Sequence, residues 1–184
     1  MEEMIFMPKK AGKGLMEKGA HIMRRKAIDP GGDPYLNKEA PLDMALCKRC
    51  GSVYHEKRWY QRAELPERLS DAPATEIVFC PGCQKFRDKY PEGYLTIEGK
   101  FVEAHGDEIM NLIANKEDRQ LHINPLEQII EIRRHDGLIE VKTTTGKLAQ
   151  RLGQVIQKTF SGEIAYKWSV DTKIARVVWR RDDE

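Results

Sequence analysis

The stretches that decide the fold are CKRCG at residues 47–51 and CPGC at residues 80–83. Two thiolates three positions apart in a tight turn can bind one metal ion from the same side. Two such turns that face each other complete a tetrahedron. Four thiolates favour zinc over magnesium or calcium. The sequence therefore predicts one structural zinc ion with the ligands Cys47, Cys50, Cys80 and Cys83.

The residues within and between the two pairs support a zinc ribbon over residues 45–90. Gly51 suits a turn that needs a positive φ after its second cysteine, and Pro81-Gly82 provides turn chemistry inside the second pair. The spacer, residues 51–79, is long for a minimal ribbon. We therefore expect it to carry a hairpin or an irregular excursion, with bends at residues 64–66 and 71–73.

Two other uses of these cysteines compete with a structural metal. Cys80-Pro81-Gly82-Cys83, followed by a short helix, resembles a redox dithiol. A redox site needs one pair, however, and paired motifs favour a metal. A catalytic zinc keeps an open position for water, whereas four cysteines close the coordination shell. His55 is close enough in sequence to replace one cysteine, but nothing requires it to do so.

Composition excludes a membrane protein and gives no support for an enzyme. Hydrophobic residues make up 40% and charged residues 33% of the 184 residues. No apolar run approaches the length of about 20 residues that spans a bilayer, and the N-terminus lacks the apolar core of a secretory signal. We therefore expect a cytoplasmic protein. The five histidines are scattered, and no nucleophile elbow or phosphate-binding loop is present, so no small-molecule substrate is evident.

The chain divides into three parts. Residues 1–44 are rich in Gly, Pro and Lys and contain the breaker cluster DPGGDP at 29–34, so we expect a flexible basic segment. Residues 45–90 form the zinc ribbon. Residues 91–184 read as a small α+β unit, in which helices pack on an antiparallel sheet.

Hydrophobic periodicity predicts the elements of the third part. A short strand or hairpin is expected over residues 94–101, then a helix that starts near Gly106. Strands at 129–132 and 138–141 flank Asp136-Gly137, a strong hairpin signal. Threonines at 143–145 can cap a helix, which ends at Ser161-Gly162. A second hairpin joins 163–169 to 174–179, and Trp168 and Trp179 are expected in the core. The apolar stripe of the second helix comprises Leu148, Leu152, Val155, Ile156 and Phe160.

Basic residues gather in the N-terminal half, although the net charge is only +2. Such clusters attract phosphate groups, and exposed rings such as Trp59 and Tyr60 can stack on unpaired bases. The alternatives are a solvated tail and rings that pack under the ribbon. The candidate nucleic-acid contacts are Lys9, Lys10, Lys13, Arg24, Arg25 and Lys26 in the first part, and Arg49, Lys57, Arg58, Lys85 and Arg87 in the second.

Over residues 46–181 the chain resembles the ribosomal large-subunit export and maturation adaptors shared by archaea and eukaryotes. The features behind this resemblance are the two cysteine pairs, the segment 94–101 and the Asp136-Gly137-Leu138 turn before a helix. The layout is closer still to that of short bacterial zinc-ribbon proteins. The resemblance implies a zinc protein that contacts the large ribosomal subunit or its RNA. That family carries more cysteine pairs and further domains, so only the four zinc ligands carry over.

These observations favour a non-enzymatic zinc protein that binds RNA or the ribosome. A protein–protein adaptor with a structural zinc is the alternative, and a thiol-based or hydrolytic enzyme is a third. RNA binding through phosphate contacts predicts an affinity that falls steeply with salt.

Overall fold

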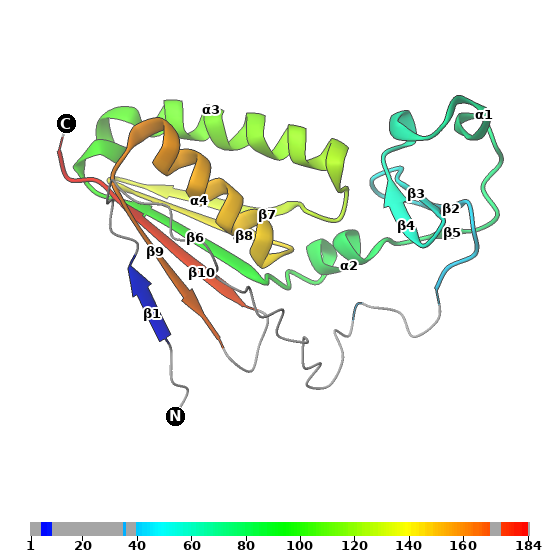
Figure 1. Ribbon diagram of the computed structural model, residues 1–184, viewed down its shortest axis with the longest axis horizontal. Helices are drawn as coiled ribbons and strands as arrows, with labels where there is room; N and C mark the ends of the chain where they lie inside the picture. Colours follow the sequence, from blue (N-terminus) through cyan, green and yellow to red (C-terminus); the bar gives the residue numbers. More distant parts are fainter. Residues whose placement is uncertain (1–4, 9–34, 36–39, 170–173, 184) are drawn as a thin grey trace, which may run out of the picture.

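The computed structural model describes residues 5–8, 35, 40–169 and 174–183. These residues form two units joined through helix α2 (Pro81–Arg87). One unit contains both cysteine pairs, and the other is a larger sheet with two helices on one face (Figure 1). The predicted basic segment therefore lies almost entirely outside the described residues, including its six candidate nucleic-acid contacts. The mixed helix and sheet content confirms the α+β class.

The smaller unit is built on a four-stranded sheet in the order β4-β3-β2-β5. Strand β3 pairs antiparallel with both β2 and β4, whereas β5 pairs parallel with β2. The spacer makes the expected hairpin between β3 and β4 and an irregular excursion with two short helices. The cysteine cluster in this unit is compatible with a zinc ribbon. The elements are β2 (Ala45–Cys47), β3 (Val53–His55), β4 (Arg58–Tyr60), the 3-10 helix η1 (Arg62–Glu64), α1 (Glu67–Ser70) and β5 (Ile77–Val78).

The larger unit is a six-stranded sheet in the order β1-β9-β10-β6-β8-β7. The two predicted hairpins, β7–β8 and β9–β10, are present and antiparallel. The prediction of a purely antiparallel sheet is wrong, because β6 lies between the hairpins and runs parallel to β10. The elements are β1 (Ile5–Pro8), β6 (Gly93–Glu98), α3 (Lys100–Ile123), β7 (Ile129–His135), β8 (Leu138–Thr143), α4 (Gly146–Phe160), β9 (Glu163–Trp168) and β10 (Ala175–Arg180).

Helix α4 supplies the centre of the main core, as its apolar stripe predicts. Its N-cap is Thr145, whose hydroxyl accepts a hydrogen bond from the backbone N–H of Leu148 at 3.2 Å. Leu148, Leu152 and Ile156 are fully buried against the sheet. The expected helix end at Ser161-Gly162 is also observed. Regular spacing on one helix face was sufficient to predict this packing.

Helix α3 begins at Lys100, which is earlier than predicted. Gly99 ends β6 with φ +117°, and a Cβ there would lie 2.1 Å from the carbonyl oxygen of Arg181. The chain therefore turns directly from strand to helix, and no hairpin forms over residues 94–101. The backbone leaves helical geometry at His105 (φ −114°, ψ 15°) and resumes at Gly106. The predicted start near Gly106 thus marks the kink within a longer helix.

The two tryptophans of the C-terminal hairpin lie in different environments. Trp179 is fully buried, as predicted, and its indole N–H donates to the carbonyl oxygen of Ser161 at 2.7 Å. Trp168 is 48% exposed at the end of β9, so its assignment to the core is wrong. The turn predicted at residues 171–173 lies outside the described residues. Among the helices that the structure describes, none is long and apolar enough to cross a bilayer.

Candidate metal centre

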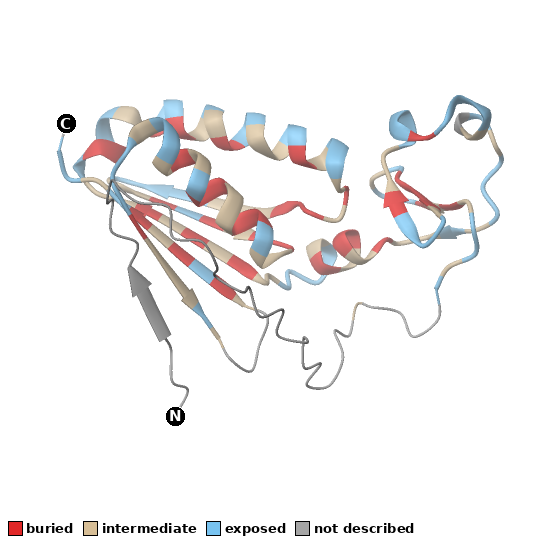
Figure 2. Cartoon of the chain, viewed as in Figure 1, coloured by how far each residue is buried: buried red, intermediate tan, exposed pale blue. Residues whose placement is uncertain are grey.

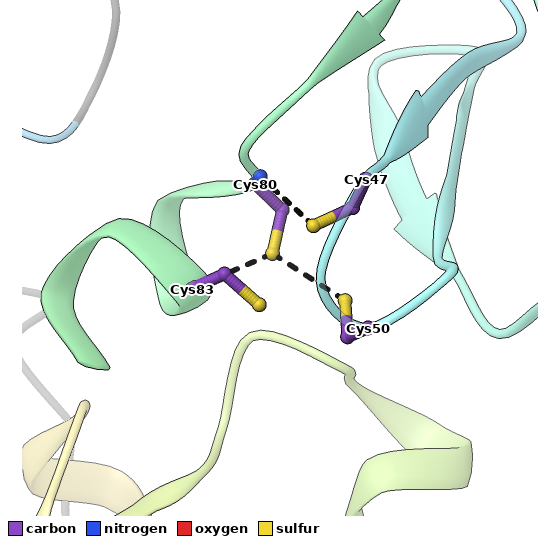
Figure 3. A group of neighbouring side chains, drawn as sticks. All are labelled: Cys47, Cys50, Cys80 and Cys83. Carbon is purple, nitrogen blue, oxygen red and sulfur yellow. Dashed lines mark hydrogen bonds between the residues drawn. The ribbon is translucent and has the colours of Figure 1, made fainter. Parts of the chain in front are cut away.

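The four cysteines converge on one point, although the two pairs are distant in sequence (Figure 3). All four Sγ atoms lie within 4.8 Å of one another, and those of Cys50 and Cys80 are 3.7 Å apart. Tetrahedral zinc with bonds of about 2.3 Å to sulfur places its ligands about 3.8 Å apart. Each cysteine is a free thiol. The donor set and its dimensions therefore fit a metal site with four thiolate ligands, as predicted for Cys47, Cys50, Cys80 and Cys83.

The first pair sits on a turn that leaves the end of β2. The backbone N–H of Gly51 donates to the carbonyl oxygen of Cys47 at 2.9 Å, and that of Cys47 donates to Ser52 at 2.8 Å. Gly51 has φ +70°, and no atom lies within 4 Å of the place a Cβ would occupy. Backbone conformation alone therefore explains this glycine, in agreement with the sequence prediction.

The second pair sits at the start of α2. Cys80 is the N-cap residue, and its Sγ accepts the backbone N–H of Cys83 at 3.4 Å. The backbone N–H of Cys80 donates in turn to Sγ of Cys47 at 3.3 Å. Pro81 occupies the first helical turn, where its missing N–H costs nothing. Backbone N–H donors stabilise thiolates, so both turns are prepared to hold a cation.

Gly82 has a different role from the turn residue that the sequence indicated. It lies in α2, and a Cβ at this position would meet the carbonyl oxygen of Leu126 at 2.7 Å. Leu126 belongs to the segment between α3 and β7, and its side chain packs on the cysteine cluster. Gly82 therefore permits close contact between the metal centre and the larger unit.

Two side chains reach the sulfur of Cys83 from different parts of the chain. Arg49 donates from Nη1 to Sγ at 3.3 Å, and Gln128 donates from Nε2 at 3.5 Å. Nη1 of Arg49 also donates to Oε1 of Gln128 at 2.7 Å, while Nε2 of Gln128 donates to the carbonyl oxygen of Pro125. Groups that hydrogen-bond a ligand fix its orientation and tune the metal. Gln128 precedes β7, so the larger unit takes part in the metal centre.

Hydrogen bonds among the sulfur atoms give the thiols different acidities. Those from Cys50, Cys80 and Cys83 hold the pKa of Cys47 far below its usual range. The contact with Cys47 raises the pKa of both Cys50 and Cys80. The same contact opposes ionisation of Cys83, but hydrogen bonds from Cys50, Cys80 and Arg49 outweigh it and lower that pKa to about 6. A metal ion held by all four thiolates would displace the protons that the thiols carry.

The predicted nucleic-acid contacts around the metal centre have separate environments. Lys57 and Arg58 are exposed at the turn between β3 and β4. Arg87 is exposed near the end of α2 and pairs with Asp88 at 2.7 Å. Lys85 is buried instead, and its Nζ lies 2.5 Å from Oε1 of Glu92. A buried, paired ammonium is not placed to contact a phosphate, so the structure removes Lys85 from the candidate set.

The aromatic candidates also divide. Trp59 is only 7% exposed and packs on Tyr54, with ring centroids 5.4 Å apart, so it folds inward under the small sheet. Tyr60 is half-buried, with the Arg58 guanidinium 5.5 Å from its ring centroid. His55 hydrogen-bonds Asp43 at 3.0 Å and is not part of the cysteine cluster.

Sequence reasoning missed two rings that flank the second cysteine pair. Lys48 Nζ lies 4.1 Å from the ring centroid of Phe79, and Arg87 lies 5.2 Å from the same centroid. Arg49 lies 3.6 Å from the ring centroid of Phe86. We call these five residues the cation–aromatic cluster. The positions of the rings, immediately before Cys80 and three residues after Cys83, could have indicated them. No local signal could have indicated Gln128.

No protein-family model, curated protein sequence or solved structure matches this chain. The class of protein therefore rests on the site itself. The fold and the cysteine cluster define an α+β protein with a candidate structural metal centre.

Proposed function

We propose that this is a zinc-stabilised, non-enzymatic protein that binds single-stranded RNA, free or exposed in the ribosome. The cation–aromatic cluster beside the metal centre is the observation that supports this function most directly. Basic side chains neutralise phosphates, and rings or guanidinium planes stack on unpaired bases. Lys48 and Arg87 can neutralise phosphates, and the ring that both of them approach, Phe79, can stack on a base.

A cavity next to this cluster suits a flat base. Its volume is about 230 Å³, and its lining includes Tyr54, Trp59, Phe79 and Leu126. Lys57 also lines it and would place a cation at the rim. A base could enter between these apolar groups while its phosphate remained near the lysine.

Zinc has a purely structural role in this proposal. Four thiolates leave no open coordination position for water, and the hydrogen bonds from Arg49 and Gln128 already occupy the surroundings of Cys83. The ion would hold the two cysteine turns together and thereby display Lys48 and Phe79. Native mass spectrometry should find one zinc per chain, and another metal, or none, would contradict this assignment.

The direct test is fluorescence anisotropy of a labelled single-stranded oligouridylate titrated with the zinc-loaded full chain. We expect Kd to rise steeply with salt, with a slope in log Kd of about 0.7 for each phosphate contacted. Lys48→Gln and Phe79→Leu should each weaken binding severalfold or more. Lys158→Gln, on the exposed face of α4, is the matched control. An affinity unaffected by salt and by both cluster variants would refute the proposal. Sedimentation with and without ribosomes separates the two sources of RNA.

An adaptor that binds another protein is the second candidate. It is favoured by Ile77, which is 67% exposed on β5 at the edge of the small sheet, and by Leu42, which is 62% exposed. Edge strands offer unpaired backbone groups to an incoming strand. A protein that stays bound after nuclease treatment, and is lost in Ile77→Lys, would favour this function over RNA binding.

A further inference from the structure

The six-stranded sheet has one face that no helix of the described chain covers. Helices α3 and α4 pack on the face that carries Leu95, Val141 and Val177 (Figure 1). Successive side chains of a strand point to opposite faces. The intervening residues of β6, β8, β9 and β10 therefore form the second face. Along β6, β8 and β10, buried positions alternate with partly or fully exposed ones (Figure 2). This face is open to a ligand as far as the described residues show.

One row across the open face combines basic residues with a central ring. The strand register places Lys142 beside Tyr94, Tyr94 beside Arg176, and Arg176 beside Lys167. With strands about 4.8 Å apart, the row spans about 14 Å. Arg176 lies 5.3 Å from the ring centroid of Tyr94. We call these four residues the basic row.

Positive charge is concentrated in this row and is balanced elsewhere on the face. The neighbouring rows place Glu140 opposite Arg133, and both Glu98 and Glu163 opposite Arg180. In the basic row, the acid is Glu131, which lies opposite Lys142 and pairs with it at 2.8 Å. Among the described residues of this face, cations therefore outnumber acids around a tyrosine at the end of the sheet where β6 begins. This end follows α2 and lies nearest the metal centre (Figure 1).

We infer that the basic row is a second contact surface for single-stranded RNA. Tyr94 stacks on a base, and Arg176, Lys142 and Lys167 neutralise neighbouring phosphates. The ligand is polyanionic because the row is cationic. It is single-stranded because splayed bases can reach a ring on an open sheet, whereas the stacked and paired bases of a duplex cannot. This inference rests on the proposed RNA-binding function but uses a surface distinct from the cation–aromatic cluster.

The test uses the zinc-loaded full chain and a labelled single-stranded oligouridylate, with a duplex of the same length as competitor. Tyr94→Leu should weaken binding about tenfold, because a base–aromatic stack is lost. Tyr94→Phe, which keeps the ring, should bind within about twofold of the native chain. Arg176→Gln should lower the salt slope by about 0.7. The matched control is Arg180→Gln, an exposed arginine of the same strand and face that lies between acids and should leave both values unchanged.

The outcomes distinguish this inference from the proposed function. If Lys48→Gln and Phe79→Leu weaken binding while Tyr94→Leu and Arg176→Gln do not, the basic row is wrong and the proposed function stands. If the oligouridylate does not bind at all, both fail. Equal loss in Arg180→Gln and Arg176→Gln, or duplex that competes as well as single strand, would also overturn the basic row. Circular dichroism of each variant shows whether a loss of binding reflects misfolding. If Arg176→Gln misfolds, Arg176→Lys replaces it in the test. Because lysine keeps the charge, this variant should have the salt slope of the native chain.

Discussion

Removing the metal should unfold the cysteine unit and leave the larger unit folded. Apart from cysteines, the buried members of its cluster are Ala45, Tyr54 and Trp59. Val53 and Leu65 are also buried in this unit, so four large side chains contribute about 6 to 12 kcal/mol, whereas a structural zinc contributes about 10 to 16 kcal/mol. The zinc ion therefore contributes more than the apolar core does, and its contribution is comparable to the whole stability of a typical domain, about 5 to 15 kcal/mol. The small core therefore cannot hold this unit without the ion.

Hydrogen exchange measured by mass spectrometry, before and after chelation, resolves the two units. Peptides from residues 45–60 and 77–87 should lose their protection. Peptides from residues 93–98 and 139–156, which contain the main core, should keep it. The segment 124–128 should lose protection partially, because Leu126 and Gln128 contact the metal centre from the larger unit.

Two results would refute this reasoning. If residues 45–60 stayed protected after complete removal of the metal, packing rather than zinc would hold the unit together. If both units lost protection together, the larger core would depend on the metal, and the division into two units would be wrong. Thiol titration serves as the control, since all four cysteines should become reactive when the ion has left.

Three further predictions test particular contacts by substitution. In urea unfolding, Gly82→Ala should destabilise the protein by about 1 to 3 kcal/mol, because the added methyl group clashes with the backbone of Leu126. The control Gly51→Asn should cost much less, because the site has open space and asparagine tolerates a left-handed backbone. Equal losses would contradict the close approach of Gly82 to Leu126. Lys85→Ala should cost about 3 to 5 kcal/mol because it leaves the carboxylate of Glu92, which is only 14% exposed, without its partner. A change below 1 kcal/mol would show that this pair is solvated. Burial raises the pKa of Glu117, so stability falls as pH rises from the ordinary glutamate pKa of about 4.3 to the raised folded value. Glu117→Gln keeps an oxygen that can accept the hydrogen bond from the backbone N–H of Ile129. It should therefore abolish the fall in stability with pH and raise Tm at pH 7. An unchanged dependence of stability on pH would show that Glu117 does not cause the fall.

Local patterns in the sequence were enough to predict the cluster of four cysteines and several elements. Spacing within each cysteine pair places two thiols on one turn, and Gly51 marks the positive φ that the turn requires. Helix α4 follows from its apolar stripe, and the β7–β8 hairpin follows from Asp136-Gly137. Each of these features depends on residues close together in the chain, so the sequence carries the full physical reason for it.

Features that depend on distant residues were missed or misread. The parallel pairing of β6 with β10 joins segments about eighty residues apart, and nothing within β6 distinguishes a central strand from a hairpin arm. Gly99 ends that strand because of its contact with Arg181, which is just as distant. Gln128 is a further example, since its role at Cys83 exists only after the two units meet.

The basic residues near the cysteine cluster show why charge alone does not identify candidate RNA contacts. Lys85 is buried in an ion pair, Arg49 holds Cys83 in place, and Lys48 lies over an aromatic ring. These side chains are equivalent in a count of charges, yet removing each one should have a different consequence. Arg49→Gln would loosen the metal centre as well as remove a charge, so a loss of RNA binding in that variant would not identify a contact. Lys48→Gln removes a charge without touching a ligand, which makes it the decisive substitution for the cation–aromatic cluster.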